Sequence, residues 1–157
     1  MKTKEQIFSP ETPLGKFEAA VRVSWSFETA YPGDASSWTP ENPALGQCVV
    51  TMLVLADYFP GGSFLKSTEH HHYAYKLGEQ LIDLTGEQFG LEAEIVFDTT
   101  SDRERLMNST GAVVAWTPER YALLRGRVEK ILGAPGGMVV GKGPAGSDPV
   151  GDLVVVI

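Results

Sequence analysis

One segment of this chain is apolar on almost every side. Residues 48–55, which read CVVTMLVL, carry no charge and contain Thr51 as their one hydroxyl side chain. A helix of this composition has no face suited to solvent, so it is predicted to be buried. Asn42-Pro43 precedes it, and Pro60-Gly61-Gly62 stops it, because proline and paired glycines do not extend a helix. The sequence therefore predicts one central helix, with Cys48 in its first turns.

Apolar spacing and helix breakers divide the rest of the chain into short elements. The predicted helices lie at about 15–25, 101–109 and 118–132, and the predicted strands at 63–66, 72–76, 80–84, 93–97 and 153–157. This pattern predicts an α+β fold in which the cysteine-bearing helix packs on a small antiparallel β-sheet, with further helices around it.

The length of 157 residues suits a single domain with its own core. We expect a loosely ordered lead-in at 1–15, one α+β domain at 16–133 and a tail at 134–157, where glycine and proline are too frequent for fixed elements. Within the domain, Ser101 is the expected cap of the 101–109 helix, Thr117-Pro118 opens the last helix and Gly133 ends it.

The chain carries 20 acidic and 13 basic residues, which gives a formal net charge of −7. This charge repels phosphate backbones and anionic lipid surfaces, so neither nucleic acid nor a membrane is an expected partner. The first residues lack the apolar core of a signal peptide, and no apolar run approaches the ~18 residues of a membrane span. We therefore expect a cytoplasmic protein that acts on a small-molecule or peptide-like substrate.

Strands 72–76 and 80–84 are predicted to form a hairpin around Leu77-Gly78. A two-residue turn there pairs Lys76 with Glu79 and sets His72 directly opposite Asp83. These two side chains then share one face, with Cβ atoms ~5 Å apart, within reach of an imidazole-to-carboxylate hydrogen bond. One more loop residue would reverse this parity. The other face carries residues suited to the core, namely Tyr73, Tyr75, Ile82 and Leu84.

Cys48, His72 and Asp83 follow one another in the order nucleophile, base and orienting carboxylate. Free N–H groups and the dipole at a helix N-terminus stabilise a thiolate, which suits Cys48 to nucleophilic attack. Each residue also has a structural interpretation. Cys48 can be a small hydrophobe in a buried helix, His72 part of a solvated turn, and Asp83 a cap of the turn that follows it. Because the three residues occupy matching positions, the catalytic and the structural interpretations have about equal weight.

No metal or other cofactor is expected. A single cysteine excludes a zinc site built from several thiolates, as well as an internal disulfide. His70, His71 and His72 are adjacent, and because neighbouring side chains on a strand alternate between its faces, the three cannot converge on one ion.

Acyl transfer needs hydrogen-bond donors for an oxyanion, and Gln47 and Gln88 are candidates beside the backbone N–H of Cys48. Either glutamine is more commonly a structural residue than a catalytic one. Trp25 and Trp38 have two interpretations, as packing residues or as walls of a substrate cleft.

Several short motifs lie along residues 16–132. They are Ser24-Trp25-Ser26-Phe27-Glu28-Thr29, Trp38, Asn42-Pro43, Gly46-Gln47-Cys48 with Thr51, Gly61-Gly62, His72-Tyr73, Asp83-Leu84-Thr85 with Gln88-Phe89, and Arg120-Tyr121 with Leu124. Together they resemble the YunG-like family of uncharacterised bacterial proteins. The sequence departs from that pattern at Ala74-Tyr75, where an aromatic residue and an asparagine commonly follow His-Tyr. The tail from residue 134 has no counterpart in it.

The resemblance implies a compact relative of the papain-like and NlpC-type cysteine peptidases, and hence a papain-like core. On that analogy Cys48 is the nucleophile, His72 the base and Asp83 the orienting residue. The expected function is that of a cysteine-dependent hydrolase or acyl transferase acting on an amide, isopeptide or thioester bond. The alternative is a non-catalytic binding or regulatory protein on the same scaffold, which an inert thiol would favour.

Overall fold

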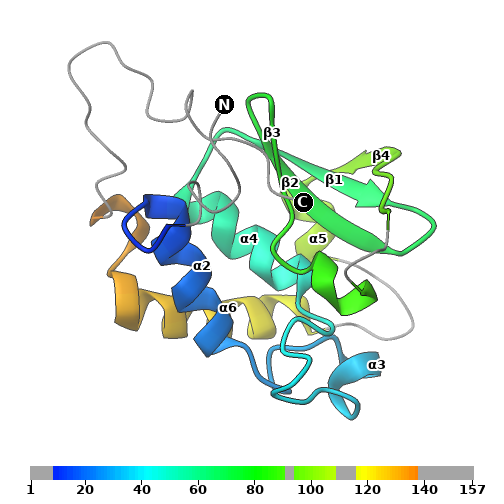
Figure 1. The fold of residues 1–157 in the computed structure, drawn as a ribbon, viewed down its shortest axis with the longest axis horizontal. Helices are drawn as coiled ribbons and strands as arrows, with labels where there is room; N and C mark the ends of the chain where they lie inside the picture. The colour runs from blue at the N-terminus through cyan, green and yellow to red at the C-terminus, as the bar shows by residue number, and fades with distance from the viewer. Residues whose placement is uncertain (1–8, 91–93, 109–115, 138–157) are drawn as a thin grey trace.

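The computed structural model describes residues 9–90, 94–108 and 116–137. Within these ranges, helices lie along one side of a four-stranded antiparallel sheet with the strand order β3-β2-β1-β4 (Figure 1). The α+β class predicted from the sequence is confirmed. The strands are β1 (Ser63–Ser67), β2 (His72–Leu77), β3 (Gln80–Ile82) and β4 (Thr99–Ser101).

Helix α4 (Cys48–Tyr58) lies at the centre of the molecule. Its residues 50–55 are all 0% exposed, which confirms the burial predicted from their composition. Strand β2 packs against α4 from the sheet, and helix α6 (Thr117–Leu132) packs against it from the helical side (Figure 1). Thr51 accepts a hydrogen bond from Trp25 Nε1 at 2.9 Å, so its buried hydroxyl is satisfied.

Helix α2 (Pro13–Ser24) packs against α6. It begins two residues before the predicted start, because Thr12 caps it by accepting a hydrogen bond from the N–H of Gly15 at 3.0 Å. Leu14 is fully buried, so the end of the stretch predicted as a lead-in contributes to the core. Further along α2, the ring of Phe17 packs against Tyr58 and Phe59, with centroid distances of 5.5 and 6.0 Å.

The turn between β2 and β3 differs from the predicted one. Leu77 pairs with Gln80, so the two turn residues are Gly78 and Glu79. Gly78 has a φ of 60°, a left-handed conformation that glycine adopts without steric cost. Leu77, the first turn residue of the predicted hairpin, would be strained in this conformation.

The new turn shifts the hairpin register by two residues. Tyr75 pairs with Ile82, and extending this register sets Asp83 opposite Ala74. Because side chains alternate with a period of two, a shift of two leaves every side chain on its predicted face. His72 and Asp83 are therefore diagonal neighbours on one face, rather than direct partners.

The predicted strand at 93–97 is wrong for the residues described. Residues 94–98 form no regular element, and Val96 is 67% exposed. Strand β4 instead pairs with β1 three residues after Val96, and the N–H of Asp98 donates to Lys66 O at 3.1 Å just before it. Alternating apolar residues favour extended backbone, but pairing with β1 decides which residues join the sheet edge. Residue 93 lies outside the described residues.

Three short elements connect the larger ones: α3 (Pro32–Ala35), η1 (Gly86–Phe89) and α5 (Arg103–Met107). The cap of α5 is Asp102 and not Ser101. Asp102 Oδ1 accepts a hydrogen bond from the N–H of Arg105 at 2.8 Å, which places a carboxylate at the positive end of the helix.

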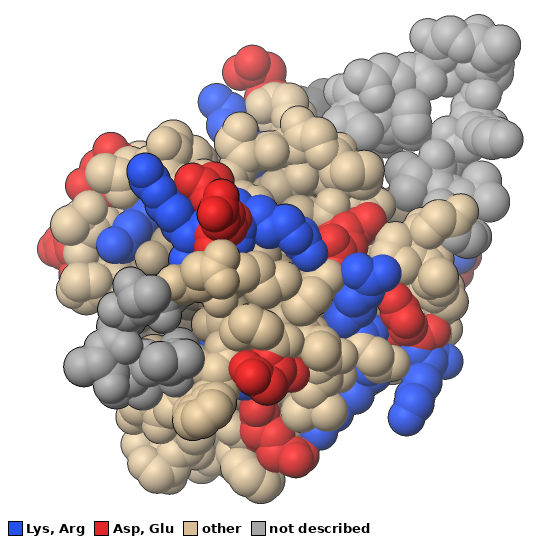
Figure 2. Space-filling model, turned by 180° about the vertical axis from the view of Figure 1, so that it is seen from behind, with Lys and Arg blue, Asp and Glu red and all other residues tan. Residues whose placement is uncertain are grey.

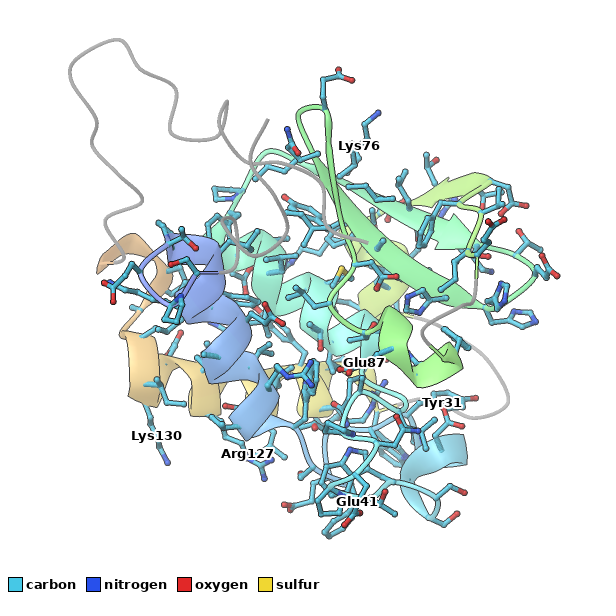
Figure 3. All side chains as sticks on the ribbon, viewed as in Figure 1. Tyr31, Glu41, Lys76, Glu87, Arg127 and Lys130 are labelled. Carbon is cyan, nitrogen blue, oxygen red and sulfur yellow. The ribbon has the colours of Figure 1, made fainter. Side chains whose placement is uncertain are left out.

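Helix α6 ends as predicted at Gly133, which has a φ of 81°, and the short η2 (Pro135–Gly137) follows. The N-cap residue of α6 is Trp116, which has a φ of 46°, and Thr117 is the first helical residue. Charged side chains such as Arg127 and Lys130 project outward from α6 (Figure 3). No helix in the described ranges has the length and apolar character needed to cross a membrane. The predicted strand at 153–157 lies outside those ranges.

Candidate active site

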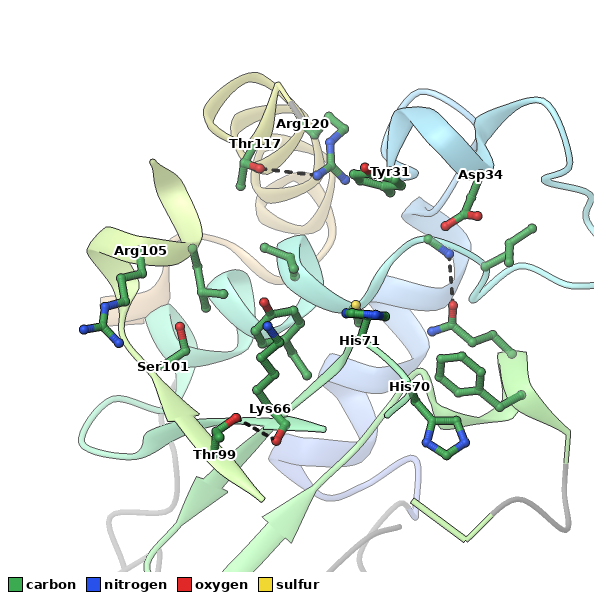
Figure 4. A pocket seen from close by; sticks show the side chains of 18 of the residues that line it. Tyr31, Asp34, Lys66, His70, His71, Thr99, Ser101, Arg105, Thr117 and Arg120 are labelled. Carbon is green, nitrogen blue, oxygen red and sulfur yellow. Dashed lines mark hydrogen bonds between the residues drawn. The ribbon is translucent and has the colours of Figure 1, made fainter. Parts of the chain in front are cut away.

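Cys48 is the first residue of α4 and lines a cavity of about 930 Å³ (Figure 4). The residue is partly exposed and forms no disulfide. The cavity lies among the start of α4, strands β1, β2 and β4, the turn between β1 and β2, and the first turn of α6. The thiol is therefore at a cavity wall rather than sealed in the core.

The backbone before Cys48 is held by two distant segments. The N–H of Gly46 donates to Gln88 Oε1 at 3.2 Å, and Gly46 O accepts from the N–H of Tyr31 at 2.8 Å. Gly46 has a φ of 72°, and a Cβ there would lie 2.9 Å from the backbone nitrogen of Tyr31. Glycine is needed at this position both for its conformation and for the space it leaves.

Gln47 points into the core. It is 0% exposed, its Nε2 donates to Ser26 O at 3.0 Å, and its Oε1 accepts from Thr29 Oγ1 at 2.8 Å. Gln47 is the N-cap residue of α4 but makes no capping bond through its side chain. The first-turn N–H groups of α4 have no acceptor within the helix, so they are the donors that this end of α4 presents.

The other predicted candidates have varied surroundings. Gln88 lines the cavity, although its Nε2 donates to Thr85 O at 3.0 Å. Neither Trp25 nor Trp38 is among the described lining residues. Trp25 is 4% exposed within the core, and Trp38 Nε1 donates to Pro43 O at 2.9 Å within its own loop. Both tryptophans are placed for packing.

The predicted pairing of imidazole and carboxylate is present. His72 Nε2 lies 2.9 Å from both Oδ1 and Oδ2 of Asp83, and the two side chains are 0% and 1% exposed. His72 begins β2, and Asp83 directly follows β3. The N–H of Thr85 donates to Asp83 Oδ1 at 3.1 Å, which fixes the carboxylate beside the ring.

The surroundings of His72 favour its protonated form. Burial lowers the pKa of His72, but its hydrogen bond to Asp83 and its interaction with Cys48 outweigh burial and raise the pKa from 6.5 to about 9. Its Nδ1 is buried and makes no regular hydrogen bond to a described residue. Because Asp83 occupies Nε2, Nδ1 is the nitrogen left for the thiol. The rings of Phe89 and Phe97 flank the imidazole at 4.9 and 5.9 Å.

Two further residues, Tyr73 and Arg120, line the cavity with Cys48 and were not predicted from the sequence as site residues. Burial raises the pKa of Tyr73, and Cys48 raises it further. Burial lowers the pKa of Arg120, while Cys48 and Tyr31 oppose that change. Arg120 precedes the buried Leu124 and Val128 at intervals of four, so helical periodicity could have placed it on the inner face of α6.

The three adjacent histidines have separate surroundings. Within the ranges that the structure describes, no three His, Cys, Asp or Glu side chains come together as metal ligands. The ring of His70 packs against Phe89 at 5.2 Å, and His71, at a φ of 49°, lines the cavity (Figure 4).

Comparison with known proteins places the chain in a family. A family model described as YunG protein matches residues 13–133. The chain belongs to the YunG family. A relative called "Uncharacterized protein YunG" from Bacillus subtilis (strain 168) is 33% identical over 91 residues, which cover 57% of this chain and 74% of the relative. No solved structure matches the chain.

The region shared with the YunG family contains the whole candidate site. Cys48, His72, Asp83 and Arg120 all lie within the matched residues 13–133. The description of the YunG relative names no activity, so a function has to be argued from the site itself.

Proposed function

We propose that this YunG-family protein is a cysteine-dependent hydrolase or acyl transferase that acts on an amide, isopeptide or thioester bond. The observation that carries the proposal is the environment of His72, a buried imidazole bonded to Asp83 through one nitrogen and coupled to the thiol of Cys48. Buried polar atoms need partners, and the thiol is the group that this position offers to Nδ1. A nucleophile, a base and an orienting carboxylate are the parts that thiol-based acyl transfer requires.

In the proposed reaction, the thiolate of Cys48 attacks the carbonyl carbon and forms a C–S bond. The carbonyl oxygen takes the negative charge, and N–H groups in the first turn of α4 stabilise it. As the bond to the leaving group breaks, His72 gives that group a proton. Neutral His72 then takes a proton from water or a second nucleophile, which attacks the acyl carbon. The C–S bond breaks, Cys48 leaves as the thiolate, and the starting pair of thiolate and protonated His72 is restored. Asp83 keeps the ring in one orientation throughout.

A papain-like relationship is part of this proposal. It is supported by an α+β fold in which the cysteine begins a buried helix and the histidine begins a strand of the adjoining sheet. The carboxylate binds Nε2 and leaves Nδ1 for sulfur. This is an analogy of architecture and roles, which adds to the argument from the site but does not replace it.

The test is a panel of electrophilic acyl probes, containing thioesters, activated esters and peptide amides, read by intact mass. We expect an acyl adduct on the wild-type protein, where Cys48 is the single thiol, and none on Cys48→Ala. Asp83→Asn should slow acylation by at least ~100-fold, because the ring loses its orienting carboxylate. Asp98→Asn is the matched control, since this carboxylate accepts from the N–H of Thr68 on the surface. Acylation that survives Cys48→Ala unchanged would contradict the mechanism, and a thiol inert to every probe would favour the non-catalytic alternative.

A further inference from the structure

The cavity beside Cys48 is positively charged, although the chain as a whole is acidic. Its described lining residues include three cations, Lys66, Arg105 and Arg120, against one carboxylate, Asp34. On the molecular face shown in Figure 2, by contrast, Lys and Arg are interspersed with Asp and Glu. Arg105 is paired with Asp102 at 3.4 Å, so Lys66 and Arg120 are the lining cations considered for substrate binding.

Arg120 is the most deeply placed of these cations. It lies in the first turns of α6 and is 6% exposed. Its Nη1 donates to Thr29 O at 2.9 Å, and its Nη2 donates to Thr117 Oγ1 at 3.4 Å, so the guanidinium has a fixed position. Figure 4 shows it beside Tyr31 on the helical wall of the cavity. Arg120 and Cys48 line the same cavity.

Lys66 approaches from the opposite wall. It lies on β1, and Figure 4 shows it on the sheet side of the cavity with Thr99 and Ser101. Its Nζ lies 5.8 Å from the centroid of the Tyr73 ring, which itself interacts with Cys48. The thiol therefore has a cation on the helical wall and a second cation on the sheet wall.

We propose that the substrate of this cavity carries a carboxylate close to its scissile carbonyl, and that Arg120 and Lys66 bind this carboxylate. The inference rests on the function proposed for Cys48. The planar guanidinium fork suits a carboxylate, and low local dielectric strengthens the attraction compared with water. A neutral acyl group of the same size gains none of this binding. Arg120 and Lys66 are thus binding residues that select an anionic substrate.

Two small alkylating reagents test the proposal. Iodoacetate and iodoacetamide react with the same thiolate and differ chiefly in that iodoacetate carries a carboxylate. The ratio of their rates with Cys48 is independent of the fraction of thiol that is ionised. We expect the rate with iodoacetate divided by the rate with iodoacetamide to be at least ~10-fold larger for Cys48 than for glutathione. This factor is the scale of one charge-assisted hydrogen-bonded pair. Saturation with iodoacetate, but not with iodoacetamide, is also expected.

Variants separate the two cations from His72, whose charge also attracts an anion. Arg120→Gln and Lys66→Gln should each lower the rate ratio several-fold, and Asp34→Asn should raise it. Lys130→Gln, on the outer side of α6, is the matched control and should leave the ratio unchanged. Because Arg120 is buried, its variant is checked by near-ultraviolet circular dichroism, and the partly exposed Lys66 provides the test if Arg120→Gln does not fold.

The outcomes distinguish this inference from the proposed function. If iodoacetamide labels native Cys48 readily but the wild-type ratio equals that of glutathione, the carboxylate site is overturned and the proposed function stands. A raised ratio that neither Lys66→Gln nor a folded Arg120→Gln lowers also overturns the site. If neither reagent labels the native thiol, both proposals fail together.

Discussion

The two ring nitrogens of His72 meet different surroundings. Nε2 is bonded to Asp83 at 2.9 Å, whereas Nδ1 is buried without a regular hydrogen bond to a described residue. The ring is also enclosed by Phe89 and Phe97, which limit its contact with water. An imidazole enclosed in this way loses its charge easily unless an anion compensates it. Asp83 and Cys48 are the groups that keep His72 protonated.

A titration of His72 by NMR follows from this environment. With a pKa of about 9, the ring stays protonated as the pH rises past 6.5 and loses its proton only near pH 9. In Asp83→Asn the hydrogen bond to a charged carboxylate is gone while burial remains, so the midpoint should fall by roughly 1 to 3 pH units. Nitrogen-15 shifts of the ring measure this midpoint directly. A wild-type midpoint at or below 6.5 would contradict the described environment.

The turn after β3 positions the Asp83 carboxylate. Asp83 accepts a hydrogen bond from the N–H of Thr85, and the short η1 helix follows at Gly86. A Cβ on Gly86 would lie 2.6 Å from Asp83 Oδ2 and 3.2 Å from its Cγ. The glycine therefore leaves the space that the carboxylate occupies beside His72.

Gly86→Ala should push the Asp83 carboxylate away from the imidazole. We expect acylation of Cys48 to slow by roughly 10-fold to 100-fold, because small displacements of catalytic groups are costly, while the fold is retained. The matched control is Gly126→Ala within α6, where a Cβ meets no atom within 4 Å. That variant should gain ~0.5–1 kcal/mol of stability with unchanged acylation. Equal acylation rates for the two variants would show that the carboxylate does not need this space.

The local sequence pattern was sufficient to predict the helices whose apolar residues and flanking breakers are clear. Helix α4 was predictable because residues 48–55 are apolar all round, and α6 because a proline and Gly133 bracket its apolar stripe. The hairpin face was predictable because an error of two residues preserves parity. The edge strand was not, since β4 (Thr99–Ser101) is short and polar, and its pairing with β1 rather than a local apolar pattern places it in the sheet.

At the scale of the whole molecule, the site combines segments that are far apart in the chain. The pairing of His72 with Asp83 could be predicted because strand parity constrains it. Periodicity could have placed Arg120 on the inner face of α6, but its position beside Tyr31 at the cavity could not be predicted, since it depends on how α6 and the loop after α2 dock around α4. The inward direction of the Gln47 side chain could not be predicted either, because its partners Ser26 and Thr29 belong to that same loop.

The nucleophilic role of Cys48 is tested most directly by the rate at which iodoacetamide alkylates the native thiol in the wild-type protein and in Asp83→Asn. The wild-type thiol should be alkylated while the protein is folded, and Asp83→Asn should slow the reaction, because the imidazole beside the sulfur loses its orienting carboxylate. Since the chain has one cysteine, a single mass shift reports the reaction. A native thiol that stays unlabelled until the protein is unfolded, or whose labelling rate is the same in wild type and Asp83→Asn, would contradict a nucleophile at this position.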